Sequence, residues 1–251
     1  MTMIFKILEI RIDNLSKREI KKKILLAIFG NKFCQISTIN PEIILEAKKN
    51  KTLKKILNAT YLNIVDGIGI KFAFFWKFKK KLKFRWAGAD LMCEILNMAN
   101  DKNLKVFLIA KKSGLSKWKE TADTIKTKYP RLIISGLDYD NDYNLLKKKI
   151  KEFNPCIVFC SLGAPEQEIV LEKIGRNHKN KIKIAIGVGG SFDFITKKIK
   201  RAPKFLRKTG LEWLWRLLQQ PHRIKRIFRA VILFPLNILF ERKFQNIRIM
   251  K

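Results

Sequence analysis

Residues 156–168 read CIVFCSLGAPEQE, and this stretch decides the fold class. It begins with a short apolar run that is typical of a buried strand, and it continues through Gly163 into a segment with helical spacing. Glu166 and Glu168 stand in the expected first turn of that helix, where negative charge is favourable. A strand, a tight turn and a helix in direct succession form the repeating unit of a parallel α/β sheet.

The same alternation runs through most of the chain. It predicts βαβ units and a mostly parallel, Rossmann-like sheet flanked by helices. The expected strands are 4–12, 33–38, 61–65, 105–110, 132–135, 156–161 and 182–187. The expected helices are 16–29, 41–57, 68–77, 89–102, 115–128, 143–152 and 165–175. Ligands of such sheets bind beyond the carboxyl ends of the strands, so polar residues that follow strands are the candidates for a site.

The composition changes near residue 196. Residues 196–251 hold sixteen Lys and Arg against two acidic residues, a net +14 of the chain's +33. Within them Trp213 and Trp215 alternate with arginines, which predicts short amphipathic helices, a second of them starting at Pro221. We therefore predict an α/β core over 1–195 and a basic helical appendage over 196–251 that associates with a membrane.

A net charge of +33 in 251 residues calls for polyanionic partners, which include nucleic acid, anionic lipid and phosphate-rich substrates. Some of the lysines need no partner, since they stand on solvated helix faces. An RNA-binding protein is the alternative from another functional class. We favour a membrane and no nucleic acid, because the aromatic residues of the basic segment lie on an apolar stripe and no RNA-binding module is recognisable.

Neither cysteines nor apolar runs point to a secreted or membrane-spanning chain. The four cysteines lack metal-ligand spacing and favour free thiols in a reducing cytoplasm. The N-terminus alternates like a strand and lacks the plan of a signal peptide. The longest apolar run, 230–240, is shorter than the ~18–20 residues that span a bilayer, and Pro235 interrupts it. We expect a cytoplasmic protein attached peripherally to the inner face of the plasma membrane.

Two polar clusters follow predicted strands. Thr38 and Asn40 follow one strand, and Asp66 follows the next. Asn40 before Pro41 is also an ordinary helix cap, and Asp-Gly is also an ordinary turn. Because both strand ends meet at one edge of a parallel sheet, a carboxylate there could take a proton from an acceptor hydroxyl.

Three further segments carry candidate residues. Arg85 precedes a turn and is suited to a phosphate or sugar, although a solvated arginine is an equal alternative. Gln167 could present its amide to a sugar or base. The GVGGSFD run at 187–193 lets backbone amides approach a phosphate, yet it fits neither the dinucleotide fingerprint nor a P-loop. The chain also has no HExxH motif and no His cluster, so we expect no metal and no cofactor, and arginines as the groups that neutralise a diphosphate.

Taken in order, five blocks of this sequence resemble the WecG/TagA/CpsF glycosyltransferase family. They are TINPE (38–42), VDGIGI (65–70), RWAGADL (85–91), SLGAPEQE (161–168), and VGGSFDF followed by KRAPKFLRKTGLEWLWRLLQQPHRIKR (188–226). The resemblance covers essentially the whole chain to about residue 229. One departure is that ITKKIKRAP lacks the glycine expected two or three residues before Lys200 and Arg201.

The resemblance implies an inverting, metal-independent transfer of N-acetylmannosamine from a UDP-sugar to polyprenyl-diphosphate-linked GlcNAc in teichoic acid or other surface polysaccharide synthesis. Another UDP-hexose, or the uronic acid of N-acetylmannosamine in capsule, exopolysaccharide or common-antigen synthesis, is the alternative. The resemblance leaves open whether the protein forms a homo-oligomer. The catalytic residues it implies are Asp66, as the general base, and Thr38. The substrate-binding residues it implies are Asn40, Arg85 and Gln167 in the sugar pocket, Gly189, Gly190 and Asp193 at the nucleotide, and Arg216, Arg223 and Arg226 at the diphosphate and membrane.

Overall fold

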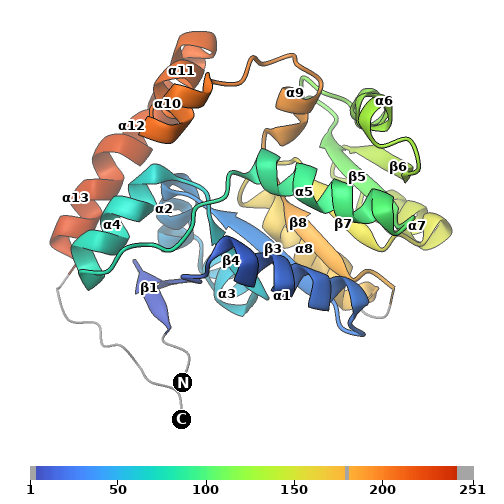
Figure 1. The fold of residues 1–251 in the computed structure, drawn as a ribbon, viewed down its shortest axis with the longest axis horizontal. Helices are drawn as coiled ribbons and strands as arrows, with labels where there is room; N and C mark the ends of the chain where they lie inside the picture. Colours follow the sequence, from blue (N-terminus) through green and yellow to red (C-terminus); the bar gives the residue numbers. More distant parts are fainter. Residues whose placement is uncertain (1–3, 179–180, 242–251) are drawn as a thin grey trace.

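The centre of the molecule is a six-stranded parallel sheet in the order β4-β3-β8-β7-β5-β6, seen in a computed structural model that describes residues 4–178 and 181–241 (Figure 1). Its strands are β3 (Cys34–Ile39), β4 (Leu62–Val65), β5 (Lys105–Lys111), β6 (Ile133–Tyr139), β7 (Ile157–Cys160) and β8 (Ile184–Gly187). Four of them are buried along their full length, as their continuous apolar runs predict for a sheet covered on both faces. The prediction of a Rossmann-like parallel sheet is therefore confirmed.

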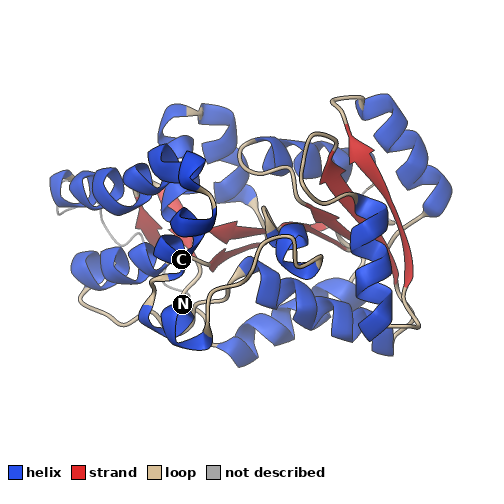
Figure 2. Ribbon diagram, turned by 90° about the horizontal axis from the view of Figure 1, so that it is seen from above, coloured by secondary structure: helices blue, strands red, loops and turns tan. Residues whose placement is uncertain are grey.

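Helices cover both faces of this sheet (Figure 2). On one face α1 (Lys17–Phe29), α5 (Gly88–Asp101) and α6 (Trp118–Lys128) pack in one apolar cluster. On the other face α7 (Tyr143–Phe153) and α8 (Glu166–Asn177) form a second. The helices α2 (Pro41–Lys49), α3 (Lys51–Ala59) and α4 (Ile68–Phe78) form a third at the β3–β4 end. The predicted helical segments are thus present.

The predicted strand 4–12 is wrong in its extent. The chain reverses at Leu8 and Glu9, giving β1 (Phe5–Ile7) and β2 (Ile10–Ile12), an antiparallel pair apart from the main sheet. Both turn residues have positive φ, 45° and 68°, as a two-residue hairpin turn requires. The run contains no Gly, Asn or Asp at this position, so the usual sequence signal for a hairpin is missing.

The predicted helix 41–57 is likewise two helices. Asn50 ends α2 and caps α3, because its side-chain oxygen accepts a hydrogen bond of 2.9 Å from the backbone of Leu53. Periodicity continues across this joint, which is why the spacing alone predicts one helix.

The C-terminal segment leaves the core after α9 (Ser191–Ile195) and crosses to the end of the molecule where α4 lies (Figure 1). It forms the helices α10 (Lys204–Thr209), α11 (Glu212–Gln219), α12 (Ile224–Phe228) and α13 (Phe234–Phe240), with a single 3-10 turn at Pro221–Arg223 and a π-helical stretch at Arg229–Leu233. The predicted restart at Pro221 is confirmed. The end of the predicted appendage, residues 242–251, lies outside the described residues.

The last of these helices is buried against the core. Phe234 and Ile238 of α13 are 1% and 6% exposed and belong to the same apolar cluster as α2 and α4. The earlier helices α10 and α11 have no comparably buried apolar side chain. No helix of residues 4–178 or 181–241 is both long enough and apolar enough to cross a bilayer.

Candidate active site at the strand ends

The carboxyl ends of β3, β4 and β8 bring the first two predicted clusters together. The backbone amide of Asp66 donates to the carbonyl of Ile39 at 2.8 Å, which ties the end of β4 to the end of β3. A Cβ added to Gly67 would lie 2.6 Å from the ring of Pro41, so a glycine is needed where the two motifs meet. The expectation that TINPE and VDGIGI share one edge of the sheet is therefore met in the structure.

Asp66 is a partly buried carboxylate with a raised pKa. Its Oδ2 accepts a hydrogen bond of 3.2 Å from the amide of Gly88, and its other oxygen has no donor among the described residues. Burial raises the pKa of Asp66 to about 6, with Glu212 adding to the rise, while the Gly88 amide, Arg85 and Arg216 oppose it. A carboxylate with this pKa is ionised at neutral pH and is still basic enough to accept a proton.

Thr38 and Asn40 flank this carboxylate, and both use their side chains inside the protein. Thr38 Oγ1 donates to the carbonyl of Gly187 at 3.1 Å, joining β3 to the end of β8. Asn40 Oδ1 accepts from the amide of Ile43 at 3.0 Å and so caps α2. The capping alternative is thus realised for the oxygen of Asn40, while its amide nitrogen is not used by the cap.

Gln167 is a buried clamp between two glycine loops. Its Oε1 accepts from the amides of Gly163 and Gly189, at 3.2 and 3.1 Å. Its Nε2 donates to the carboxyl of Glu168 at 2.8 Å, and burial raises the pKa of Glu168 to about 7. The amide predicted to contact a sugar or base therefore shapes the loops in this structure, and direct contact with a substrate stays a prediction.

The glycine run after β8 forms an open turn. Gly189 has a φ of +51°. A Cβ built at Gly189 would have no other atom within 4 Å, and the same holds for a Cβ built at Gly163. Asp193 lies on the short helix that follows and accepts a hydrogen bond of 2.9 Å from Ser116. Of the predicted nucleotide residues, Gly189 therefore has a backbone conformation that glycine adopts easily and open space beside it.

Arg216 lies against this turn, and Arg223 and Arg226 of the same C-terminal segment are its electrostatic neighbours. A Cβ on Gly190 would lie 2.5 Å from Nη2 of Arg216, and the Arg216 guanidinium also lies over the ring of Phe194, 5.2 Å from its centroid. Burial and the neighbouring cations Arg216 and Arg226 lower the pKa of Arg223 to about 10. Arg226 is paired with Glu42 on α2 at 2.5 Å.

These guanidinium groups have unused capacity for an anion. The Nε atoms of Arg216 and Arg223 are buried without a hydrogen-bond partner. Burial is also the main cause that lowers the pKa of Arg216, with Arg226 adding to it. Closely spaced cations with unmet donors favour a bound phosphate, because an anion would satisfy both the charge and the hydrogen bonds.

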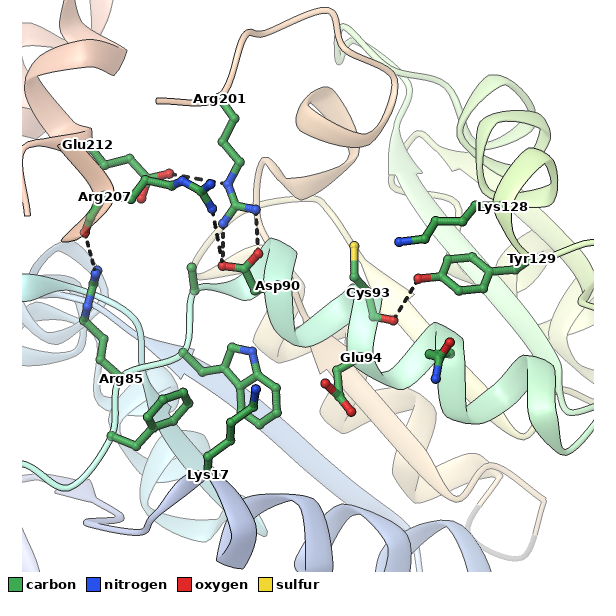
Figure 3. A pocket seen from close by; sticks show the side chains of 14 residues that line it. Lys17, Arg85, Asp90, Cys93, Glu94, Lys128, Tyr129, Arg201, Arg207 and Glu212 are labelled. Carbon is green, nitrogen blue, oxygen red and sulfur yellow. Dashed lines mark hydrogen bonds and ion pairs between the residues drawn. The ribbon is translucent and has the colours of Figure 1, made fainter. Parts of the chain in front are cut away.

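Arg85 connects the loop of Asp66 to the C-terminal segment. One of its nitrogens, Nη1, donates to the carbonyl of Asp66, and the other, Nη2, donates to the carbonyl of Arg207, each at 3.0 Å. It also lines a pocket of about 500 Å³ on the outer side of α5 (Figure 3). Its guanidinium therefore has two backbone partners in this structure, and the contact with a phosphate or sugar stays a prediction.

Sequence reasoning missed a cluster of ion pairs around Asp90 in that pocket. Arg201 and Arg207 both point at Asp90 from the C-terminal segment (Figure 3). Arg201 forms a two-pronged contact with Asp90, at 2.6 and 2.7 Å, while Arg207 lies 3.9 Å away. Asp90 lies in the RWAGADL motif and Arg201 lies in the KRAP motif. The opposite charges of these two residues are the only sequence signal that the motifs meet.

Comparison with known proteins decides the family. A profile of the glycosyl transferase WecG/TagA/CpsF family matches residues 5–248. The chain belongs to this family. It is 34% identical over 234 residues to an N-acetylglucosaminyldiphosphoundecaprenol N-acetyl-beta-D-mannosaminyltransferase of Bacillus subtilis (strain 168), covering 92% of this chain and 86% of the relative. A protein of Bacillus spizizenii with the same name is 36% identical over 200 residues, 78% of this chain and 76% of the relative. The protein is thus a glycosyltransferase, and the resemblance stated from its motifs is confirmed.

Proposed function

We propose that this glycosyltransferase moves an N-acetyl-β-D-mannosaminyl group from a UDP-sugar to GlcNAc carried on a polyprenyl diphosphate. The observation that carries the proposal is a carboxylate of raised pKa, Asp66, close to a cluster of partly buried arginines beside a glycine turn. The activity named for both Bacillus relatives supports the choice of sugar and acceptor.

In this proposal Asp66 is the general base. Its unused oxygen takes the proton from the acceptor hydroxyl as that oxygen attacks the anomeric carbon. The bond from that carbon to the diphosphate breaks on the opposite face, and UDP leaves with the bonding electrons. Because a single displacement of this kind inverts the anomeric centre, a β-linked product requires an α-linked donor. Thr38 and Asn40 border the space where the reacting sugars lie.

The arginines serve the leaving group. UDP leaves with a negative diphosphate, and Arg216, Arg223 and Arg226 place positive charge beside the turn at Gly189 and Gly190. Within residues 4–178 and 181–241 there is no group of three His, Cys, Asp or Glu side chains suited to a metal ion. We assign neutralisation of the diphosphate to these guanidinium groups because the Nε atoms of Arg216 and Arg223 lack a hydrogen-bond partner among the described residues, with the backbone of the glycine turn and Asp193 holding the nucleotide.

We further propose that residues 196–251 attach the enzyme to the inner face of the plasma membrane. This segment carries +14 of the chain's net charge, and its helices expose Phe205, Leu218, Ile224 and Phe228. Basic segments with exposed apolar side chains bind anionic bilayers, where the acceptor lipid resides.

Incubation of the purified enzyme with a panel of UDP-sugars and a synthetic GlcNAc-diphosphate lipid tests the function. We expect a disaccharide lipid from UDP-N-acetylmannosamine, with a β linkage in its NMR spectrum, and no comparable product from UDP-glucose. Transfer of a different sugar alone would replace the proposed donor. Absence of transfer from every donor, together with salt-sensitive RNA binding, would overturn the proposal in favour of a nucleic-acid-binding protein.

A further inference from the structure

Helix α4 exposes a row of aromatic side chains. Phe72, Phe75 and Trp76 are 67%, 52% and 51% exposed, and their spacing of three and four residues places them on one face of the helix. The opposite face is buried through Ala73 and Phe74, so the orientation of the helix is fixed by its packing. Three large aromatic rings in water are an unfavourable surface unless something covers them.

This aromatic face adjoins the C-terminal helices. Helix α13 packs directly on α4 (Figure 1), and a Cβ built at Gly69, near the start of α4, would lie 3.8 Å from the ring of Phe234. At the other end, Lys77 of α4 pairs with Glu241 at 2.6 Å, and both side chains are nearly buried. The start of α4 therefore contacts α13, and its end is tied by an ion pair to the residue that follows α13.

Helix α13 itself has a second, exposed apolar side. Leu236, Leu239 and Phe240 are 42%, 57% and 84% exposed, while Phe234 and Ile238 face the core. Since α13 lies against α4, the exposed apolar side chains of the two helices stand on neighbouring parts of the surface.

The charge around the aromatic face selects its partner. Residues 67–84 contain six lysines and no acidic residue, and Lys71, Lys79 and Lys81 are exposed. A second copy of this chain would bring a like charge of +33, which opposes association. An anionic lipid surface offers both the negative charge and the apolar depth that aromatic rings at an interface require.

We propose that the aromatic face of α4 (Phe72, Phe75 and Trp76) is a membrane-docking element that inserts into the headgroup region of an anionic bilayer beside α13. Attachment then involves the core itself as well as the C-terminal segment. The proposal builds on the membrane-bound acceptor of the proposed function. It also places the active site, because α4 begins one residue after the Asp66–Gly67 pair, and its aromatic residues lie roughly 10–15 Å along the helix from that carboxylate at 1.5 Å per residue.

The test compares three forms of the full-length chain by flotation with vesicles. They are the wild type, the triple variant Phe72→Ser, Phe75→Ser, Trp76→Ser, and a control triple variant Leu25→Ser, Leu26→Ser, Phe29→Ser. The control removes exposed apolar side chains of α1, which lies on another part of the molecule. Vesicles contain phosphatidylcholine with or without phosphatidylglycerol, and circular dichroism verifies that every variant is folded.

We expect the α4 variant to bind phosphatidylglycerol vesicles at least tenfold more weakly than the wild type, and the control variant to bind within twofold of it. Transfer to acceptor embedded in vesicles should fall with binding, whereas transfer to a water-soluble short-chain acceptor should stay within twofold. A wild-type enzyme that uses neither acceptor refutes the proposed function and leaves the vesicle result to decide the docking surface.

Unchanged flotation of a folded α4 variant overturns the inference. A variant that instead changes the oligomeric state without lipid assigns the face to self-association. If the triple variant does not fold, the single change Trp76→Phe decides, because it keeps the face apolar. Fluorescence quenching by bromine-labelled lipid must then be smaller in this variant than in the wild type, and equal quenching would contradict insertion of Trp76.

Discussion

The variant Asp66→Asn allows the proposed role of Asp66 in catalysis to be measured separately from its effect on stability. The amide keeps the shape of the carboxylate, and its oxygen can still accept the hydrogen bond from Gly88. It cannot accept a proton. Loss of a general base typically costs about 10²–10⁴-fold in rate, so turnover should fall by that factor while UDP binding stays nearly intact.

The same change should stabilise the fold at high pH. The pKa of Asp66 is raised from 3.8 to about 6 in the folded protein, so the native state disfavours the charge. Stability is therefore complete below pH 4 and is lost as the pH rises through about 6. A pKa shift of about two units corresponds to a destabilisation of the folded state by up to about 3 kcal/mol at pH 8. Solvent screening at this partly buried carboxylate reduces that value. Asn removes this cost.

Denaturant unfolding at pH 8 and pH 5 measures the stability, and initial rates between pH 5 and pH 8 measure the catalysis. We expect Asp66→Asn to raise the free energy of unfolding by up to about 3 kcal/mol at pH 8 and by about half of that at pH 5. The wild-type kcat/KM should rise with pH to a plateau above about 6. A variant that keeps more than about a tenth of wild-type turnover, well above the range for a lost base, refutes the assignment of Asp66.

Four further outcomes follow from the structure. Lys197→Gly should raise the free energy of unfolding by about 0.5–1 kcal/mol in a urea titration, because Lys197 has a φ of +61°, where glycine carries no steric cost. Glu168→Gln should abolish a loss of wild-type stability between about pH 4.5 and 7, since burial raises the pKa of Glu168 to about 7; equal pH profiles in urea would contradict this. EDTA should leave the transfer rate unchanged, and recovery of a chelated, inactive enzyme by Mn²⁺ would show that a metal takes part. Changing Arg216, Arg223 and Arg226 together to Glu should weaken UDP binding at least tenfold by calorimetry, and wild-type affinity would remove them from the diphosphate site.

The order of strands and helices could be predicted from the sequence, because hydrophobic periodicity and continuous apolar runs indicate directly which residues are buried. The edge of the sheet that gathers Thr38 and Asp66 followed from the same pattern, since parallel strands end on one side. The turn at Leu8 and Glu9 was not predictable, because neither residue favours positive φ and the surrounding packing imposes it.

The internal roles of the site residues were also beyond the sequence. Gln167 clamps two loops and Arg85 binds two carbonyls, and such partners come from backbone atoms, which every residue possesses and no motif records. Lys197 is the instructive exception. The family pattern leads one to expect a glycine two or three residues before Lys200, and the chain keeps the left-handed backbone there although it has lost the glycine.

The two hydrogen bonds of Arg85 couple the loop of Asp66 energetically to the C-terminal segment. Its guanidinium is shared between the carbonyls of Asp66 and Arg207, so a C-terminal segment that lifts away takes one of the two partners with it. Coupling of this kind is reciprocal. A ligand that fixes the loop of Asp66 would therefore stabilise the contact of Arg85 with Arg207, and that contact would stabilise the bound ligand by the same factor. Substrate binding at this loop would then change how strongly the C-terminal helices are held against the core.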